Sequence, residues 1–382
     1  MEFEFATAGR IVFGMGKSQD VGLYTKIYGT SALILSGGQN FVDFLSKSLD
    51  DHGVRYEVVR IQGEPTVPMI MDLLDQTRSF HYDVVIGIGG GSVLDAGKAV
   101  SALRANPGNI LDYLEVVGSN KPLLFPPVPY IAIPTTSGTG SEVTRNAVLG
   151  VPAEKVKVSL RSPLMLPKIA LIDPELTLSV PPEVTASTGL DALAQVIEPF
   201  LCTRSNWMVD LYCREGMTRA SRSLRTSYAD GSNIAARTDM AWTSLLGGLS
   251  LANAGLGAVH GFAGPIGGMF DAPHGMICAR LLPIVFAHNA IVIAKQNHSP
   301  YLARVQEVSR ILCGNNDAVI SDGVRWLTEI VKDLNVPGLS HYGVRELDIP
   351  IIVEKARNAS SMKANPVQLP VEILEEILTE AL

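Results

Sequence analysis

The chain has 382 residues, of which 47% are hydrophobic and 18% charged, and its formal net charge is −7. This composition excludes a disordered chain, and the length exceeds what one ordinary core holds, so two domains are expected. No basic tract stands out, which argues against nucleic acid or a membrane as a partner.

The N-terminal residues and the cysteines point to an intracellular setting. The first residues lack the basic and apolar regions of a secretory signal, and no uncharged apolar run reaches transmembrane length. The four cysteines lie far apart and form no CxxC pair: Cys202, Cys213, Cys278 and Cys313. We therefore expect a cytoplasmic protein with reduced, buried thiols.

The first eighty residues alternate short apolar runs with helical patterns. Strands are expected at residues 3–13, 31–36 and 54–61, and helices at residues 41–52 and 67–77. Alternation of this length predicts a parallel sheet of the α/β class.

The stretch from Asp83 to Val100 carries the strongest local signal. It begins with the β-branched run 84–86, typical of a buried strand, and a helix is expected from Val93 onward. Small residues lie between them: Gly87, Gly89, Gly90, Gly91 and Ser92. A strand, a glycine turn and a helix let backbone N–H groups bind an anion. We favour phosphate binding over a tight turn without a ligand, although the spacing is not the GxGxxG fingerprint.

A second loop follows the next buried strand, expected at residues 130–133. Its hydroxyl residues are Thr135, Thr136, Ser137, Thr139 and Ser141. They could bond a ribose, a pyrophosphate or a carboxamide, or they could be surplus helix-capping residues. Because ligands of open α/β sheets lie outside the carboxyl ends of the strands, the position favours binding.

The character of the chain changes after the first half. Alternation at residues 156–160 predicts a hairpin-like strand, and an apolar run at residues 169–172 closes the α/β region. Beyond this region helical spacing dominates. We therefore expect an α/β dinucleotide-binding domain at residues 1–178 and a helical domain at residues 179–382.

Four polar residues of the helical half form a metal-like pattern. Asp191 and Gln195 lie four apart on one helix face, and His260 and His274 follow in a glycine-rich stretch. Carboxylate oxygen and imidazole nitrogen suit Zn²⁺ or Fe²⁺. From the residues alone such a pair of histidines is more often structural than ligating, and nothing in the sequence places Asp191 beside them.

At these residues the chain resembles the iron-containing (group III) alcohol dehydrogenase family. The resemblance runs nearly end to end through GRIVFGMG, GGGSVLDAGKA, PTTSGTGSEVT, LIDPELTLSVPP, TGLDALAQVIEPF, GLGAVHGFAGPIGGMFDAPHG and NPVQLPVEILEEIL. So many motifs in one order make it specific. It implies the dehydroquinate synthase-like architecture, in which a dinucleotide domain precedes a helical domain that carries the metal.

The resemblance also implies roles for individual residues. The positions implied to contact the cofactor are Gly37, Gly89, Gly90, Gly91, Ser92, Asp95, Thr135, Thr136, Thr139, Asn146 and Lys157. The implied metal site consists of Asp191, His260 and His274, with Gln195 at the place of the family's fourth ligand, a histidine. A second histidine of the family, near the reacting centre, is Gly264 here. An amide oxygen binds a borderline metal more weakly than imidazole, so weak metal binding is expected.

The leading functional hypothesis is hydride transfer between a nicotinamide and a small alcohol or its aldehyde or ketone. The resemblance implies Lys157, His260 and His274 as catalytic residues, because a metal, a lysine or a protonated histidine can polarise the carbonyl. The alternatives are a metal-independent enzyme similar to maleylacetate reductase acting on an acidic substrate, a lyase similar to dehydroquinate synthase, and an inactive cofactor-binding protein.

The cofactor is expected to be NADP or NAD. In the family an aspartate at position 37 accompanies NAD, and Gly37 leaves room there for a 2′-phosphate. A divalent metal, Fe²⁺ or Zn²⁺, is the second cofactor implied. The expected partners are a small alcohol or aldehyde and a second copy of the chain in a homo-oligomer, a dimer.

Overall fold

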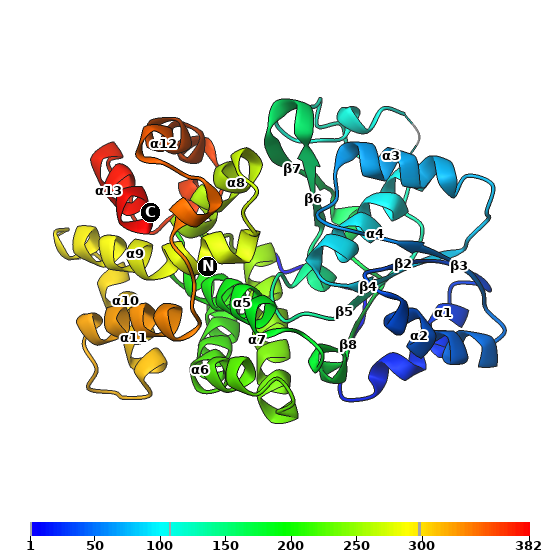
Figure 1. Cartoon of the computed structure of the whole chain (residues 1–382), viewed down its shortest axis with the longest axis horizontal. Helices are drawn as coiled ribbons and strands as arrows, with labels where there is room; N and C mark the ends of the chain where they lie inside the picture. The colour runs from blue at the N-terminus through cyan, green and yellow to red at the C-terminus, as the bar shows by residue number, and fades with distance from the viewer. Residues whose placement is uncertain (1, 107, 297–298) are drawn as a thin grey trace. The chain divides into compact units, whose positions relative to one another are not determined.

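The computed structural model describes residues 2–106, 108–296 and 299–382, which form two compact units (Figure 1). One unit, here the sheet unit, comprises Ala6–Thr136 and Gly140–Leu178. The other, the helical unit, comprises Ser179–Leu382 together with residues 2–5 and Ser137–Thr139. The chain therefore passes from one unit to the other at four points, and each unit has its own core.

A six-stranded parallel sheet forms the centre of the sheet unit. Its strand order is β1-β8-β5-β4-β2-β3. The strands are β1 (Ile11–Phe13), β2 (Ser31–Ser36), β3 (Arg55–Arg60), β4 (Val84–Gly89), β5 (Tyr130–Pro134) and β8 (Ile169–Ile172). The inner strands β2, β4, β5 and β8 are buried along their whole length, as expected for strands covered on both faces.

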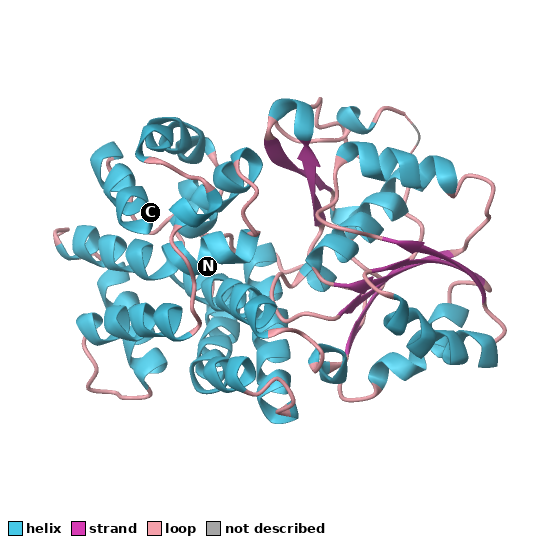
Figure 2. Ribbon diagram, viewed as in Figure 1, coloured by secondary structure: helices cyan, strands magenta, loops and turns pink. Residues whose placement is uncertain are grey.

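Helices cover both faces of this sheet. The helices are α1 (Val21–Lys26), α2 (Gln39–Asp51), α3 (Val67–Gln76) and α4 (Gly91–Ala105). One apolar core joins α1 and α2 to one face, and a second core joins α3 and α4 to the other (Figure 2). The hairpin of β6 (Asn146–Val151) and β7 (Val156–Arg161) packs into the second core. The predicted α/β class is confirmed, and the predicted strand near residues 156–160 belongs to this hairpin.

The first strand is shorter than the sequence pattern indicates. Only Ile11–Phe13 of the expected strand at residues 3–13 pairs with the sheet. Phe3 packs edge-on against Trp207, and Phe5 packs against Tyr212, both with ring centroids 5.7 Å apart. These aromatic contacts attach residues 2–5 to the helical unit instead of the sheet.

The helical unit contains no strand among its described residues. Its helices are α5 (Pro182–Leu201), α6 (Trp207–Ala229), α7 (Ile234–Asn253), α8 (Ala258–Met269), α9 (His274–Ala294), α10 (Tyr301–Cys313), α11 (Ile320–Asp333), α12 (Ile349–Asn358) and α13 (Val371–Ala381). They share one continuous apolar core. By length and composition α9 could span a membrane, but 67% of its apolar window is buried within the fold, as in a core helix.

Candidate metal centre and dinucleotide-binding loops

Helix α5 presents three polar side chains to the interior of the helical unit. Asp191, Gln195 and Glu198 occupy positions i, i+4 and i+7, so they share one face of the helix. All three residues are buried. Polar groups in such a place need partners, because an unpaired buried carboxylate or amide is costly.

Glu198 finds its partners at the beginning of α8. One carboxylate oxygen accepts a hydrogen bond from the Val259 N–H (2.7 Å), and the other lies 2.5 Å from His260 Nδ1. A side-chain carboxylate at a helix N-terminus satisfies a free N–H and interacts favourably with the helix dipole. A Cβ on Gly257 would lie 2.8 Å from Glu198 Oε1, so this close approach requires glycine there.

The hydrogen bond to Glu198 determines the state of the His260 ring. If Nδ1 carries the proton that Glu198 accepts, Nε2 is left with a lone pair. That Nε2 lies 3.2 Å from Asp191 Oδ1, while the Gln195 amide donates to Asp191 Oδ2 at 2.7 Å. Asp191 Oδ1 and His260 Nε2 are both buried and neither has a hydrogen-bond partner. Two acceptors this close repel each other unless a cation or an added proton lies between them.

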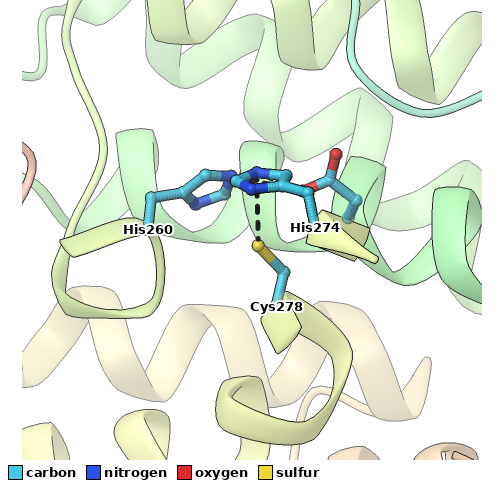
Figure 3. Close-up of side chains that lie close together, drawn as sticks. His260, His274 and Cys278 are labelled. Carbon is cyan, nitrogen blue, oxygen red and sulfur yellow. Dashed lines mark hydrogen bonds and ion pairs between the residues drawn. The ribbon is translucent and has the colours of Figure 1, made fainter. Parts of the chain in front are cut away.

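Helix α9 brings two further donors to the same place. His274 is its first residue and Cys278 lies one turn on, so both face the same way. The Cys278 sulfur points toward the imidazoles and lies 3.6 Å from His274 Nε2 (Figure 3). His274 Nε2 in turn lies 3.9 Å from Asp191 Oδ1. One ligand atom from each of Asp191, His260, His274 and Cys278 lies within 4.8 Å of the other three.

The charges of this cluster shift the pKa values of its members. Burial tends to raise the pKa of Asp191, but the imidazoles of His260 and His274 hold it down to about 2. Burial tends to lower the pKa of His260, but Cys278 and Glu198 raise it well above its usual range. The pKa of His274 is also raised, because Cys278 and Asp191 outweigh its burial. The cluster thus holds protons strongly.

The structure brings together three of the predicted metal ligands, Asp191, His260 and His274. Gln195 touches the cluster as a hydrogen-bond donor to Asp191, and its own oxygen is buried without a partner. Sequence reasoning missed Cys278 and Glu198. Helical spacing was the available signal, since Cys278 is four residues after His274 and Glu198 is seven after Asp191.

The predicted phosphate loop connects β4 to α4 in the sheet unit. Gly90 is the N-cap of α4, and Gly91 and Ser92 begin the helix. A Cβ at Gly89 would lie 2.5 Å from the Val93 side chain. Packing alone therefore explains one loop glycine. At Gly90 the nearest atom would be Thr136 Oγ1 at 3.3 Å.

Packing also explains Gly87, which lies in β4. A Cβ there would lie 2.1 Å from the Tyr130 hydroxyl, and one at Gly97 of α4 would lie 2.6 Å from the same side chain. The hydroxyl donates to the Leu94 carbonyl at 3.0 Å. Two glycines thus make room for one buried tyrosine.

The second loop follows β5 beside the first. The Thr135 N–H donates to the Gly89 carbonyl at 3.0 Å, which joins the two loops. Thr136 is the neighbour of Gly90 described above, whereas Thr139 lies in the short piece that belongs to the helical unit. Within the sheet unit, the two loops therefore place Gly90, Thr135 and Thr136 at the carboxyl ends of adjacent strands.

The partly buried Asp95 and the fully buried Lys98 of α4, here called the Asp95–Lys98 clamp, connect this helix to neighbouring segments. Asp95 accepts from the Ser141 hydroxyl (2.5 Å) and the Val148 N–H (2.9 Å), and lies 3.1 Å from Lys98 Nζ. Lys98 also donates to the Ser141 carbonyl and to Thr144 Oγ1, at 3.0 and 2.9 Å. Burial lowers the pKa of Lys98 and raises that of Glu142 to about 7, although Lys98 opposes the latter shift. The clamp joins α4 to the second loop and to β6.

The other predicted cofactor positions lie on separate elements of the sheet unit. Gly37 directly follows β2, and a Cβ there would lie 3.4 Å from the Val93 side chain and 3.8 Å from Gly89 Cα. Asn146 begins β6, and Lys157 on β7 forms an ion pair with Glu64. The charge of the predicted catalytic lysine is therefore already balanced by a carboxylate.

Gly264 lies one turn after His260 on α8. Apart from its chain neighbours and the backbone of its own helix, no described atom lies within 4 Å of the position that a Cβ at Gly264 would take. The place where the resembling family carries a second histidine is thus open space in this chain.

The chain combines a parallel-sheet unit that has a glycine loop with a helical unit that has a cluster of metal-type ligands. This combination is typical of proteins that bind a dinucleotide in one domain and a metal ion in the other. The chain belongs to the iron-containing alcohol dehydrogenase family. Residues 8–174 match the family's iron-containing alcohol dehydrogenase model, and residues 185–382 match its C-terminal model.

Individual relatives cover most of the chain. Alcohol dehydrogenase 4 of Saccharomyces cerevisiae (strain YJM789) is 32% identical over 92% of this chain and 88% of its own length. The NAD-dependent methanol dehydrogenase of Bacillus methanolicus is 30% identical over 97% of each chain. The crystal structure of a 1,3-propanediol oxidoreductase superposes with a TM-score of 0.92, at 28% identity, over 100% of both chains.

Proposed function

We propose that this protein transfers hydride between a nicotinamide dinucleotide and a small alcohol or its aldehyde or ketone. The observation that carries the proposal is the pair of buried, unpartnered acceptors, Asp191 Oδ1 and His260 Nε2, beside His274. Family membership supports the same chemistry, because the relatives are named for methanol, propanediol and other alcohols.

The donor set fits a divalent ion such as Zn²⁺ or Fe²⁺. Asp191 would supply an oxygen and the two histidines a nitrogen each, which are accepted ligands for both ions. Glu198 holds His260 by Nδ1 and so presents Nε2 to the ion. When bound, such an ion supplies the positive charge that polarises a carbonyl and stabilises an alkoxide.

The imidazoles can support the same charge without a metal. The pKa values of His260 and His274 are raised, so an apo centre keeps protons that could polarise a carbonyl. Lys157 is less suited to this role because Glu64 neutralises it. The order of importance that we propose is therefore the His–Asp cluster first and Lys157 second.

The sheet unit would hold the dinucleotide. The first turn of α4, with Gly90 and Gly91 and no side-chain cap, offers free N–H groups to a pyrophosphate. Thr135 and Thr136 offer hydroxyl groups next to it. NAD(H) is supported by the NAD-dependent relative, and the absence of an acidic side chain at Gly37 supports acceptance of NADP(H) as well.

The test is oxidation of NADH and NADPH against a panel of neutral and acidic aldehydes. The protein is assayed as purified, after chelation, and after reloading with Zn²⁺ or Fe²⁺. We expect His260→Ala to lose at least about a hundredfold in kcat/KM, in line with removal of one electrostatic group at a reacting centre. The exposed His341 provides the matched control, His341→Ala. If the protein binds NADH or NADPH but oxidises neither with any carbonyl compound, the proposal is wrong and the protein only binds the cofactor.

A further inference from the structure

We propose that Cys278 is the fourth ligand of the metal centre and that the resulting oxygen, two-nitrogen and sulfur donor set selects zinc-class ions over Fe²⁺. The proposal rests on the proposed function in one respect only, which is that the centre binds a metal ion. Gln195, which stands where the resembling family has its fourth ligand, becomes a positioning residue for Asp191.

Three of the six distances between the four ligand atoms are close to those of a tetrahedral site, and all of them lie within 4.8 Å. Zinc bonds of about 2.3 Å to sulfur and about 2.0–2.1 Å to nitrogen, at tetrahedral angles, place the two ligand atoms about 3.6 Å apart. Cys278 Sγ and His274 Nε2 are 3.6 Å apart. Nitrogen and oxygen ligands of the same ion lie about 3.4 Å apart. His260 Nε2 and His274 Nε2 lie 3.2 and 3.9 Å from Asp191 Oδ1, on either side of that value.

The centre points to a cation independently of the cysteine. Asp191 Oδ1 and His260 Nε2 are buried without partners, and the side chains of Asp191 and His260 are 3% and 7% exposed. Glu198 behind His260 completes the carboxylate–histidine pair that commonly orients a metal-bound imidazole. Cys278 is fully buried, and its sulfur faces these groups.

Gln195 is already committed to another task. Its amide nitrogen donates to Asp191 Oδ2 at 2.7 Å. Turning the amide over would place two oxygens at that distance, so the present orientation is the favourable one. The hydrogen bond fixes Oδ2 and leaves Oδ1 to face the histidines. The Gln195 oxygen is the rival fourth donor because it is buried without a partner.

Charge and softness favour the thiolate over the amide. A thiolate and a carboxylate together neutralise a divalent ion, whereas a neutral amide leaves one charge uncompensated. Thiolate ligands favour zinc, and oxygen ligands favour harder ions. The family's fourth ligand, a histidine, is replaced by Gln195 in this chain. Cys278 of α9 therefore supplies the ligand that α5 no longer provides.

Cobalt substitution tests this ligation directly. The full-length protein is stripped of metal and loaded with Co²⁺, and its near-ultraviolet spectrum is recorded. We expect a thiolate-to-cobalt charge-transfer band in the wild type that is absent from Cys278→Ala and Cys278→Ser. Cys213 is a matched control, because it is equally buried in the same unit and its thiol donates a hydrogen bond to the Ser250 hydroxyl. Cys213→Ala is expected to keep the band.

Metal affinity gives the second readout. In competition with a chromophoric chelator, Cys278→Ala should bind Zn²⁺ more than tenfold more weakly, while its circular dichroism remains that of the wild type. From an equal mixture of Zn²⁺ and Fe²⁺ without oxygen, the ratio of zinc to iron retained should be higher in the wild type than in Cys278→Ser by elemental analysis, and an equal ratio overturns the selectivity. A cobalt-loaded wild type without a sulfur band overturns the proposal. So does a Gln195→Leu variant that loses the metal while Cys278→Ala retains it.

The spectra and affinities do not depend on turnover. Hydride transfer by a protein without the sulfur band would overturn the ligation by Cys278 and leave the proposed function intact. A sulfur band in a protein that reduces no carbonyl with either cofactor would support the ligation and overturn the proposed function.

Discussion

Glu198 performs two tasks with one carboxylate, and substitution can separate them. In Glu198→Gln the remaining oxygen can still accept from the Val259 N–H, while the new NH₂ group faces His260 Nδ1. The ring must then accept at Nδ1 and carry its proton at Nε2, which is the wrong tautomer for a metal ligand. We expect Zn²⁺ affinity to fall by about 10- to 100-fold with little change in folding.

The measurement is chelator competition on the purified variant. Glu183, exposed in the first turn of the same helix, supplies the control Glu183→Gln. Equal zinc affinity in Glu198→Gln and wild type would mean that Glu198 caps the N-terminus of α8 and does not orient His260 for metal binding.

Glu142 gives a second prediction for a single residue, this time in the sheet unit. Burial raises its pKa from 4.5 to about 7 in the folded state. The folded protein therefore binds the Glu142 proton more tightly than the unfolded chain does. The stability that this proton contributes is fully present below about pH 4.5 and is lost as the pH rises through 7. A rise of this size corresponds to about 3 kcal/mol.

The variant Glu142→Gln removes this titration. We expect it to be more stable than the wild type by about 2–3 kcal/mol at pH 8 and nearly equal to it at pH 5, by urea unfolding. A constant difference between the two proteins across that pH range would show that Glu142 does not titrate as described.

The turn from β4 to α4 is the element on which cofactor binding should depend. Gly90 has φ −72° and ψ −177°, an extended conformation that alanine also adopts. Its new methyl group would lie 3.3 Å from Thr136 Oγ1, which can give slightly. Gly90→Ala should therefore fold, yet place a methyl group where a phosphate would approach the helix N-terminus.

We expect the Kd for NADH to rise more than tenfold, the loss of one or two hydrogen bonds to a charged group. Titration of NADH fluorescence measures it, and circular dichroism confirms folding. An unchanged Kd in the folded variant would remove this loop from the cofactor site.

Local patterns predicted the elements well and their long-range partners poorly. Short apolar runs predict β2, β4 and β5, because burial on both faces makes nearly every residue of such a strand apolar. The strand expected at residues 3–13 is mostly absent because Phe3 and Phe5 contact α6, far along the chain. Nothing within that stretch signals such a partner.

The same limit applies to the candidate site. Asp191, His260 and His274 were identified through a family pattern, whereas their convergence depends on how α5, α8 and α9 pack. Cys278 lies in an apolar helix and reads as a core residue. Gln195 was predicted as a ligand at the family's position, and the structure shows its nitrogen bonded to Asp191.

At the scale of the whole molecule, the contribution of residues 2–5 to the stability of the helical unit can be tested. All three tryptophans, Trp207, Trp242 and Trp326, belong to that unit, so tryptophan fluorescence reports its unfolding. Each aromatic pair contributes about 0.5–1.5 kcal/mol beyond its buried area. The double variant Phe3→Ala/Phe5→Ala should lower the urea midpoint seen by fluorescence.

The control is Met15→Ala, which changes a side chain of the sheet unit that is 60% exposed. A fluorescence midpoint equal to that of the wild type in the double variant would show that residues 2–5 add no stability to the helical unit.

The four passages between the units have a consequence for synthesis on the ribosome. The sheet unit is complete once Leu178 has been made, whereas the helical unit extends to Leu382. At 5–20 residues per second the synthesis of these two residues is separated by roughly 10–40 s. During the first part of that interval Phe3 and Phe5 have no α6 to contact, because Trp207 and Tyr212 are still unmade. Until α6 has been made, Phe3 and Phe5 therefore lack the aromatic partners that they have in the folded chain.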